Sequence, residues 1–341
     1  MHSVAAGMVL LVLAGIMNAS FALPMKFVRM WAWENTWLAW SLFALLLLPC
    51  ALAETAIPGY GAVLSEARCV LPMVVLGGAA WGVAQVLFGL ALERIGMALT
   101  FSIVLGLSAA MGSLIPLVRL HADRLFTCAG YLSMAGIALV LSGVALSAAA
   151  GRLRDRTSDR ARDLAHAGET SAHSVAGVLM AVASGLCASM MNVGFAYGQP
   201  LAAAAAAHHA GLLWTTSAIW APLMVGGAVP NVLYCLYLLR RHATVGRYGA
   251  PSGVRNLALA FCMATLWFGS SIVYGISTVM LGALGPVVGW PLFMSLIVIV
   301  ASLLGMMTGE WKRSRPAALR LQGAAVLTLV VAVIVLSRVS F

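Results

Sequence analysis

Apolar residues run along this chain in ten long stretches, which short polar or charged segments separate. Most stretches are close to the roughly 20 largely apolar residues that an α-helix needs to cross a bilayer. They are about twice as long as the strands of a membrane β-barrel, and their apolar positions do not alternate with polar ones. The pattern predicts an all-α membrane protein with ten transmembrane helices, at about 4–24, 37–53, 70–92, 97–118, 127–149, 175–196, 212–238, 256–280, 286–308 and 318–338.

Composition supports this class and excludes others. The chain has 341 residues, of which 62% are hydrophobic and only 9% are charged, whereas a soluble domain carries about 25% charged residues. The net charge of +10 comes from brief clusters between apolar runs. These clusters do not form a basic face, so we expect a lipid bilayer around the protein and no nucleic-acid partner.

The distribution of Lys and Arg predicts the orientation in the membrane. Of the 20 Lys and Arg residues, 16 lie in the loops that follow the odd-numbered spans. Basic loops stay in the cytoplasm, so both termini are expected on the outer, periplasmic side. The first apolar run is expected to be retained as a span, since no Lys or Arg precedes it and no Ala-x-Ala-like site follows it.

The two halves of the chain resemble each other. Gly7 and Gly15 align with Gly177 and Gly185. A W-x6-[FY]-G-x6-G pattern also occurs twice, as Trp81, Phe88, Gly89, Gly96 and as Trp267, Tyr274, Gly275, Gly282. Five spans in each half would place the halves in opposite orientations, as in many secondary transporters. We therefore predict two inverted five-helix repeats, 1–150 and 175–341, with a cytoplasmic linker at 151–174; chance alignment of glycines is the alternative.

Glycine and proline suggest where helices pack closely or break. Gly77, Gly78, Gly82 and Gly89 fall in the third span, and small residues let membrane helices approach one another. Pro286 and Pro291 flank Trp290. This last region is the best candidate for irregular backbone, with a broken helix near Gly285–Pro286.

The polar residues within the spans are neutral. They are amides, hydroxyls and ring donors, and no ionisable residue is predicted near a span centre. Such groups suit a neutral hydroxylated ligand, and a sugar also lays its C–H face on aromatic rings. For any one of these residues, helix packing is the alternative role. The set is Asn18, Ser20, Gln85, Ser184, Ser189, Asn192, Asn231, Ser270, Ser271, Tyr274, Trp290 and Ser295, with Trp81 and Trp267 as further rings.

No residue pattern supports catalysis or a cofactor. The six cysteines are dispersed without a CxxC pair, so zinc and redox chemistry are not expected. His208 and His209 are adjacent in an Ala-rich segment that we assign to an outer loop, with no carboxylate expected near them. We expect neither an enzyme nor a bound cofactor or metal.

One segment resembles a known family. "FALPMKFVRMWAWENTW" (21–37) matches an F-x-x-P-x-K signature followed by W-x-W-E-x-x-W. This signature is similar to that of bacterial L-rhamnose–proton symporters of the drug/metabolite transporter superfamily. "WGVAQVLFGLALERIGM" (81–97), "GQPLAAAAAAHHAG" (198–211), "GWPLFMS" (289–295) and "GEW" (309–311) also resemble that family. The resemblance implies ten helices in two inverted repeats, an inner-membrane location and proton-driven sugar uptake.

The resemblance also implies site residues. Lys26 and Glu34 are the charged pair of the signature and Trp33 and Trp37 its aromatic partners, with substrate handling, coupling or a cytoplasmic gate as their role. Combined with the residue-based reading, the predicted substrate site comprises Asn18, Lys26, Trp33, Trp81, Gln85, Asn192, Trp267, Ser271, Tyr274 and Trp290. Glu34 is the candidate for proton coupling.

The chain departs from the family in one place. Polar and acidic residues are expected just before the tryptophan of span 9, but this chain has "LGPVV" (284–288). The carboxylates left near the spans are Glu34, Glu93 and Glu310, and proton coupling usually needs a carboxylate with a raised pKa. An uncoupled facilitator or an exporter of another metabolite is therefore a second hypothesis. A membrane enzyme or a non-transporting accessory subunit is a third.

Overall fold

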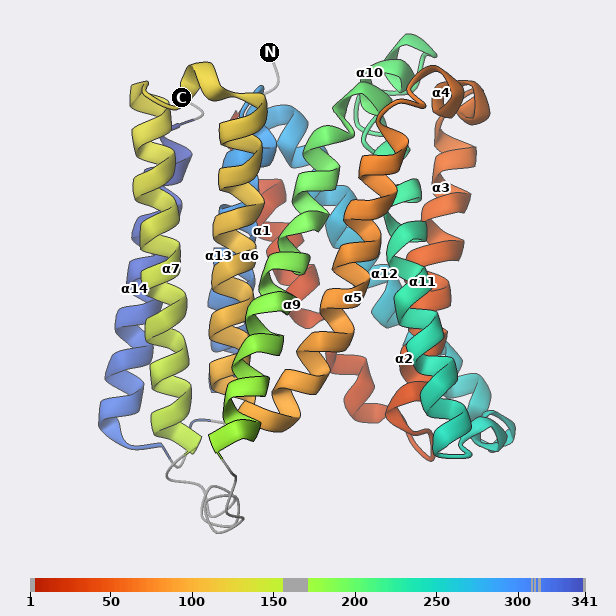
Figure 1. The fold of residues 1–341 in the computed structure, drawn as a ribbon, viewed down its shortest axis with the longest axis vertical. Coiled ribbons are helices and arrows are strands. Elements are labelled where there is room, and N and C mark those ends of the chain that lie inside the picture. Colours follow the sequence, from red (N-terminus) through yellow and green to blue (C-terminus); the bar gives the residue numbers. More distant parts are fainter. Residues whose placement is uncertain (1–3, 156–170, 308, 310, 312–313, 340–341) are drawn as a thin grey trace.

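The computed structural model of the chain describes residues 4–155, 171–307, 309, 311 and 314–339, and it shows a bundle of long helices (Figure 1). The described residues form helices joined by turns and short loops. In chain order the elements discussed here are α1 (Val4–Ser20), η1 (Leu23–Phe27), α2 (Trp33–Ser41), η2 (Leu42–Leu47), α3 (Leu48–Ala56), α4 (Tyr60–Glu66), α5 (Leu71–Ile95), α6 (Met97–Leu120), η3 (Ala122–Arg124), α7 (Cys128–Asp155), α9 (Ser171–Tyr197), α10 (Gln199–Ala207), α11 (Ser217–Arg241), η4 (Val245–Gly249), α12 (Gly253–Leu281), α13 (Gly285–Met307) and α14 (Pro316–Ser337).

The predicted all-α class and its ten spans are confirmed. Ten helical segments of the described chain are long and apolar enough to cross a membrane. Three of these segments join elements end to end: Val4–Phe27, Trp33–Ala56 and Val175–Ala207. Successive spans alternate in direction, so both ends of the described chain lie at the top of Figure 1. We call this the termini end of the bundle.

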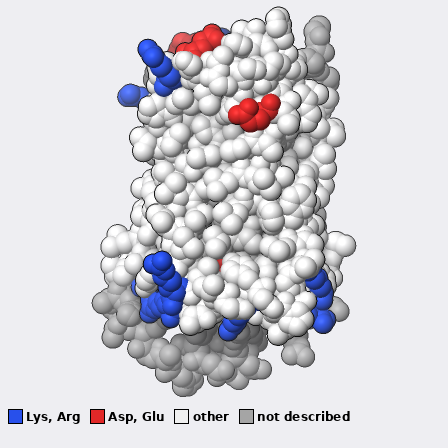
Figure 2. All heavy atoms as spheres, turned by 90° about the vertical axis from the view of Figure 1, so that its right-hand side faces the viewer, with Lys and Arg blue, Asp and Glu red and all other residues white. Residues whose placement is uncertain are grey.

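Charged side chains lie mainly at the two ends of the bundle. On the face drawn in Figure 2, a broad band without Lys or Arg separates basic residues at the bottom from charged residues near the top. We call the bottom the basic end, because most of the described Lys and Arg belong to the helix ends and loops there. They are Lys26, Arg29, Arg94, Arg152, Arg154, Arg240, Arg241, Arg247, Arg255, Arg315 and Arg320.

The second span differs from its predicted limits. It begins at Trp33 instead of residue 37, so Glu34 and Asn35 lie inside the first turn of α2. A π-helical segment, η2, interrupts the span between α2 and α3. Pro49 follows it, and a proline removes one backbone donor from a helix. The wider hydrogen-bonding ring of η2 therefore lies where the regular ladder is disturbed.

Two other local predictions are wrong. The backbone around Trp290 is regular, because α13 is continuous from Gly285 through Pro286 and Pro291. Pro286 is the second residue of α13, where a helix needs no N–H from it. The turn before α13 instead contains Gly282, whose φ of 84° favours glycine. The expected absence of a carboxylate near His208 is also wrong, because Glu66 Oε2, at the end of α4, lies 3.2 Å from His208 Nε2; the alanine-rich segment before His208 forms helix α10, in keeping with the high helix propensity of alanine.

Glycines bring α5 into backbone contact with α9 and α11, as the small residues of the third span predicted. A Cβ atom on Gly78 would overlap the carbonyl oxygen of Leu223 in α11, and one on Gly77 would lie 2.8 Å from the Met190 oxygen in α9. A Cβ on Gly82 would lie 2.5 Å from the Gly227 oxygen. Gly89 has no such neighbour within 4 Å. The seam therefore depends on the first three glycines of the span and not on the fourth.

We expect Gly78→Ala to destabilise the protein, because the methyl group would force α5 and α11 apart. Overpacking of this kind costs about 1–3 kcal/mol or more. Gly89→Ala is the matched control in the same helix, and it should be neutral or slightly stabilising because alanine favours helix. The melting temperatures of the two variants in detergent test this. Equal melting temperatures would contradict the close approach of the two helices.

Candidate functional site

A column of indole rings in contact with one another leads from the basic end into the core of the bundle. Trp33, Trp37 and Trp40 lie on one face of α2 at i, i+4 and i+7. The ring centroids of Trp33 and Trp37 are 5.1 Å apart, and those of Trp37 and Trp40 are 4.5 Å apart. Trp40 then meets Trp267 of α12 at 5.2 Å, and Trp267 stacks on Trp81 of α5 at 5.2 Å. We call these five residues the tryptophan column.

Only some of the polar groups in and beside the column have a hydrogen-bond partner. The indole nitrogen of Trp37 donates to Asn231 Oδ1 at 3.2 Å, and the Asn231 amide donates to the Gly227 carbonyl at 2.9 Å. The indole nitrogen of Trp40 and the hydroxyl of Ser41 are buried and have no hydrogen-bond partner among the described residues. Such groups cost free energy when left unpaired, so they mark places where a polar ligand would be favoured.

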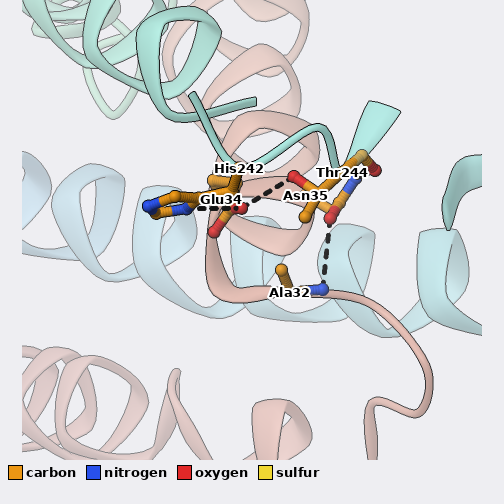
Figure 3. A network of polar contacts seen from close by, with 5 residues as sticks. All are labelled: Ala32, Glu34, Asn35, His242 and Thr244. Atoms are coloured by element: carbon orange, nitrogen blue, oxygen red, sulfur yellow. Dashed lines mark hydrogen bonds and ion pairs between the residues drawn. The ribbon is translucent and has the colours of Figure 1, made fainter. Parts of the chain in front are cut away.

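Glu34 is buried beside the column, at the basic end. Its side chain is only 5% exposed. It lies in the first turn of a helix, where the helix dipole favours negative charge. Thr244 Oγ1 donates to Glu34 Oε1 at 2.7 Å, and His242 Nδ1 lies 3.1 Å from the same oxygen (Figure 3). The His242 side chain is half exposed. Glu34 thus joins α2 to the connection between α11 and α12.

We call this arrangement the Glu34 junction (Glu34, Asn35, His242 and Thr244). The Asn35 side chain and the backbone of Ala243 both contribute to it. The Asn35 side chain accepts from the Ala32 N–H at 3.1 Å and donates to the Thr244 carbonyl at 3.0 Å (Figure 3). Ala243, between the two partners of Glu34, has a φ of 54°. A left-handed conformation costs a non-glycine residue about 1–2 kcal/mol. Strain of this kind often accompanies a functional constraint.

Further contacts extend the same interface. Tyr248 donates its hydroxyl to the Asn35 carbonyl at 3.0 Å, and its ring meets that of Trp31 edge-on at 5.0 Å. Burial raises the pKa of the Tyr248 phenol to about 12, so the phenol remains a donor at neutral pH. Asn256 donates to the Arg29 carbonyl at 2.7 Å and accepts from the Arg29 N–H at 3.3 Å. The segment before α2 is therefore tied to α12 as well as to the loop.

A second polar and aromatic cluster lies toward the termini end. Tyr274 of α12 donates its hydroxyl to Asn192 Oδ1 of α9 at 2.7 Å. The Asn192 amide donates to the carbonyls of Gly112 and Pro286, at 2.8 and 2.9 Å. Trp290 of α13 donates to the Ser108 carbonyl at 2.9 Å and meets the Tyr274 ring edge-on at 5.8 Å. This Tyr274 cluster joins α6, α9, α12 and α13.

Helix α12 connects the column to the cluster. Trp267, Ser271 and Tyr274 lie on one face of it at i, i+4 and i+7. Ser270 donates to the Trp267 carbonyl at 2.6 Å and accepts from the Asn18 amide of α1 at 2.9 Å. Eight of the ten predicted substrate-site residues therefore belong to one connected region, namely Asn18, Trp33, Trp81, Asn192, Trp267, Ser271, Tyr274 and Trp290.

The other two predicted residues are Lys26 and Gln85. Lys26 is exposed, in η1 at the basic end. Gln85 is half-buried in α5, one turn beyond Trp81, and makes no hydrogen bond to another described residue. A cavity of about 220 Å³ lies elsewhere, between α6, α7, α13 and α14, and contains none of the predicted site residues. Glu310, the third carboxylate considered, lies outside the described residues.

The sequence reading missed several residues of the region. Trp40 shares a helix face with Trp33 and Trp37, and this spacing of four and three residues could have identified it. His242 and Thr244 carried no signal, because they lie 208 and 210 residues from Glu34 in the chain. Trp220 of α11 was also missed, although its ring lies 4.6 Å from Phe195 and 6.2 Å from Tyr274.

The fold and the site together define a polytopic helical membrane protein whose described core is neutral and aromatic apart from one buried carboxylate, Glu34. Comparison with known proteins then gives the family. The model of the L-rhamnose-proton symport protein (RhaT) family matches residues 1–340. Proteins named L-rhamnose-proton symporter from Salmonella dublin, Salmonella gallinarum and Salmonella typhi are 26% identical over 334 residues, covering 94% of each chain. The chain belongs to the L-rhamnose-proton symport protein family, and is a multi-pass inner-membrane protein.

We expect Tyr274→Phe to destabilise the protein, because it removes the donor to the buried Asn192 Oδ1. An unpaired buried acceptor costs about 1–3 kcal/mol. Tyr131→Phe is the control, since the Tyr131 side chain is 56% exposed. Melting temperatures in detergent should fall by several degrees for Tyr274→Phe alone. An equal fall for both variants would argue against the hydrogen bond.

Proposed function

We propose that this protein takes up a neutral sugar, L-rhamnose, by proton symport. The observation that carries the proposal is Glu34, the one charged side chain that is buried among the described residues. It lies beside a column of tryptophans in a chain of the L-rhamnose-proton symport protein family. Relatives named L-rhamnose-proton symporter supply both the sugar and the ion of the proposal.

The Glu34 junction is suited to coupling a proton to a conformational change. The ionised carboxylate accepts a hydrogen bond from Thr244 and lies beside His242. These two contacts connect α2 to the segment between α11 and α12. Protonation of Glu34 removes its negative charge and weakens both contacts, because hydrogen bonds to a charged acceptor are the stronger ones. A proton therefore shifts the balance between the tied and the released arrangement of α2. The side chain of His242 is half exposed, so it connects the junction to solvent.

The core is chemically suited to a sugar. Its polar groups are amides, hydroxyls and indoles, which exchange neutral hydrogen bonds with sugar hydroxyls. Its rings offer flat apolar faces for sugar C–H groups. Apart from Glu34, the buried polar side chains of the described residues are uncharged, so a charged substrate would find no compensating charge there.

We further propose that transport proceeds by alternating access between two inverted repeats, 1–150 and 175–341. Gly7 of the first repeat packs against Met280 and Leu281, and Gly177 of the second packs against Arg94 and Ile95. Each contacted pair occupies the same place relative to the repeated W-x6-[FY]-G-x6-G pattern. Gly96 and Gly282, which end that pattern, both have positive φ, at 76° and 84°. These matches support the repeat assignment; most of the 151–174 linker lies outside the described residues.

The stacked pair of Trp81 and Trp267 supports the same symmetry. The two residues are equivalent positions of the repeated pattern, and their rings lie 5.2 Å apart with 28° between the planes. Equivalent residues meet where a two-fold axis passes between them. A substrate near this pair would be approached in the same way from either side, as alternating access requires.

A sugar facilitator without proton coupling is the second candidate. The stretch 284–288 contains no ionisable residue; it comprises the last residue of the turn before α13 and the first four residues of that helix, shortly before Trp290. Glu34 lies at the basic end of α2 and not midway through the bundle. Both features are compatible with a carrier that moves sugar down its gradient, and transport measurements distinguish the two candidates.

Uptake into proteoliposomes tests the function. We expect radiolabelled L-rhamnose to accumulate above its external concentration only when an inward proton gradient is imposed, and to do so better than other simple sugars. Saturable uptake that ignores the gradient would identify the facilitator. If neither L-rhamnose nor any of the other simple sugars tested (the uptake panel) shows saturable uptake, sugar transport is contradicted.

Glu34→Gln should abolish proton-driven accumulation in this assay while sugar binding is retained, because glutamine keeps the shape but cannot ionise. Glu93→Gln is the control, since Glu93 is exposed at the same end of the bundle. Accumulation that is unchanged in Glu34→Gln would remove Glu34 from the coupling role.

The proposed orientation places the basic end in the cytoplasm and both termini outside. In a cysteine-free background, an impermeant thiol reagent added outside should label cysteines introduced at position 3 and at the C-terminus. It should not label a cysteine at position 160. The opposite labelling pattern would overturn this orientation.

A further inference from the structure

Two short motifs occur once in each half of the chain. Asn18 and Phe21 form an N-x-x-F-A motif, and so do Asn192 and Phe195. On the next long helix of each half, Thr36 and Trp40 form a T-x-x-x-W motif, as do Thr216 and Trp220. The order of the motifs is the same in both halves, which adds to the repeat assignment and identifies Trp40 and Trp220 as equivalent positions.

The same ring contact forms in both halves. The Phe21 and Trp40 centroids lie 6.0 Å apart, and those of Phe195 and Trp220 lie 4.6 Å apart. In each case the phenylalanine comes at the end of the first long helix of its half and the tryptophan lies on α2 or α11. The motifs thus build one local arrangement twice, once nearer the basic end and once nearer the termini end.

Both tryptophans carry an indole donor without a partner. Trp40 and Trp220 are each 1% exposed, and neither indole nitrogen has a hydrogen-bond partner among the described residues. The hydroxyls of Ser41 beside Trp40, and of Thr216 and Ser217 within one turn of Trp220, are also buried without a partner. Buried polar groups are usually paired, so two such groupings at equivalent positions call for an explanation.

The two indoles meet one face of α12. Trp40 contacts Trp267, and Trp220 contacts Tyr274, two turns further along the helix. Ser271 lies between these two residues on the same face, and its only described hydrogen bond is a long one of 3.4 Å to the Trp267 carbonyl. A ligand on this face of α12 would meet Trp40 at one end and, at the other end, Trp220, whose indole nitrogen lies beside Gly275 of the same helix.

We propose that Trp40 and Trp220 are a pair of sugar-binding residues, one from each repeat, which donate their indole N–H groups to hydroxyl oxygens of the transported sugar. The inference rests on the proposed sugar transport and assigns its binding residues. A neutral polyol is the fitting class of ligand, because it supplies several acceptors around one ring without bringing charge into the core. Hydrogen bonds in place of unpaired donors make the bound state favourable.

Binding of L-rhamnose to the purified full chain, measured by titration calorimetry, tests the proposal. Trp40→Phe and Trp220→Phe should each raise the Kd about three- to tenfold, the loss expected for one neutral hydrogen bond. Trp31→Phe is the matched control, because its buried indole nitrogen is also unpaired but its ring packs against Tyr248 and near Ala260, two turns before Trp267 in α12. That variant should bind as the unaltered protein does.

Monodeoxy analogues of L-rhamnose, each lacking one hydroxyl, separate a direct contact from a packing defect. For each tryptophan, one analogue should lose affinity for the unaltered protein and lose nothing further in the phenylalanine variant. Replacing either tryptophan with β-(3-benzothienyl)alanine, which keeps the ring shape without the N–H, should reproduce the loss even where phenylalanine impairs folding. An unchanged Kd for either residue, or equal losses with every analogue, would overturn the proposal.

The experiments distinguish a wrong substrate assignment from a wrong assignment of the binding residues. If the unaltered protein does not bind L-rhamnose but transports another sugar of the uptake panel, the substrate assignment is wrong, and the same variants and controls are measured with that sugar. If the unaltered protein binds L-rhamnose and both tryptophan variants bind it equally well, the binding residues are wrong and the function stands.

Discussion

The absence of water from the bilayer core is the constraint on which this structure depends. Every backbone group within the core must find its partner in the protein, which makes the spans helical. The same constraint makes each buried polar side chain costly unless it is paired. The described core accordingly pairs most of its polar groups across helices, as Asn18 pairs with Ser270 and Asn192 pairs with Tyr274. The unpaired groups beside α12 stand out against this background.

Helix α12 is the element around which the core is arranged. It contacts α1 through Ser270, α5 through Trp267 and α9 through Tyr274. Its aromatic face contacts α2 through Trp267 and contacts α11 through Tyr274, two turns further along. The glycines of α5 allow backbone contact with α9 and α11. Helix α5 thus meets α9 and α11 through its backbone, and it meets α12 through the ring pair of Trp81 and Trp267.

The fold was largely predictable from the sequence, whereas the site was only partly so. Ten spans follow from the length of the apolar runs, and the stacking of Trp81 on Trp267 agrees with the repeated pattern that contains both. The broken helix expected near Gly285–Pro286 was wrong, because proline is tolerated in the first turn of a helix and Gly282 supplies the turn; α13 also continues through Pro291, which lies inside it. The partners of Glu34 were not predictable. His242 and Thr244 are more than 200 residues from Glu34 in the sequence, and a local sequence pattern does not encode a tertiary contact over that separation.

The position of α2 explains how a proton and a sugar could act on each other in the proposed mechanism. Glu34 lies in its first turn, and Trp40 lies less than two turns further along the same helix. The π-helical segment η2 begins directly after Ser41, and such segments are common at helix kinks and functional sites. In the proposed mechanism, release of Glu34 from His242 and Thr244 frees the first turn of the helix that carries Trp40. Binding of sugar at Trp40 would, by the same linkage, alter the affinity of Glu34 for its proton.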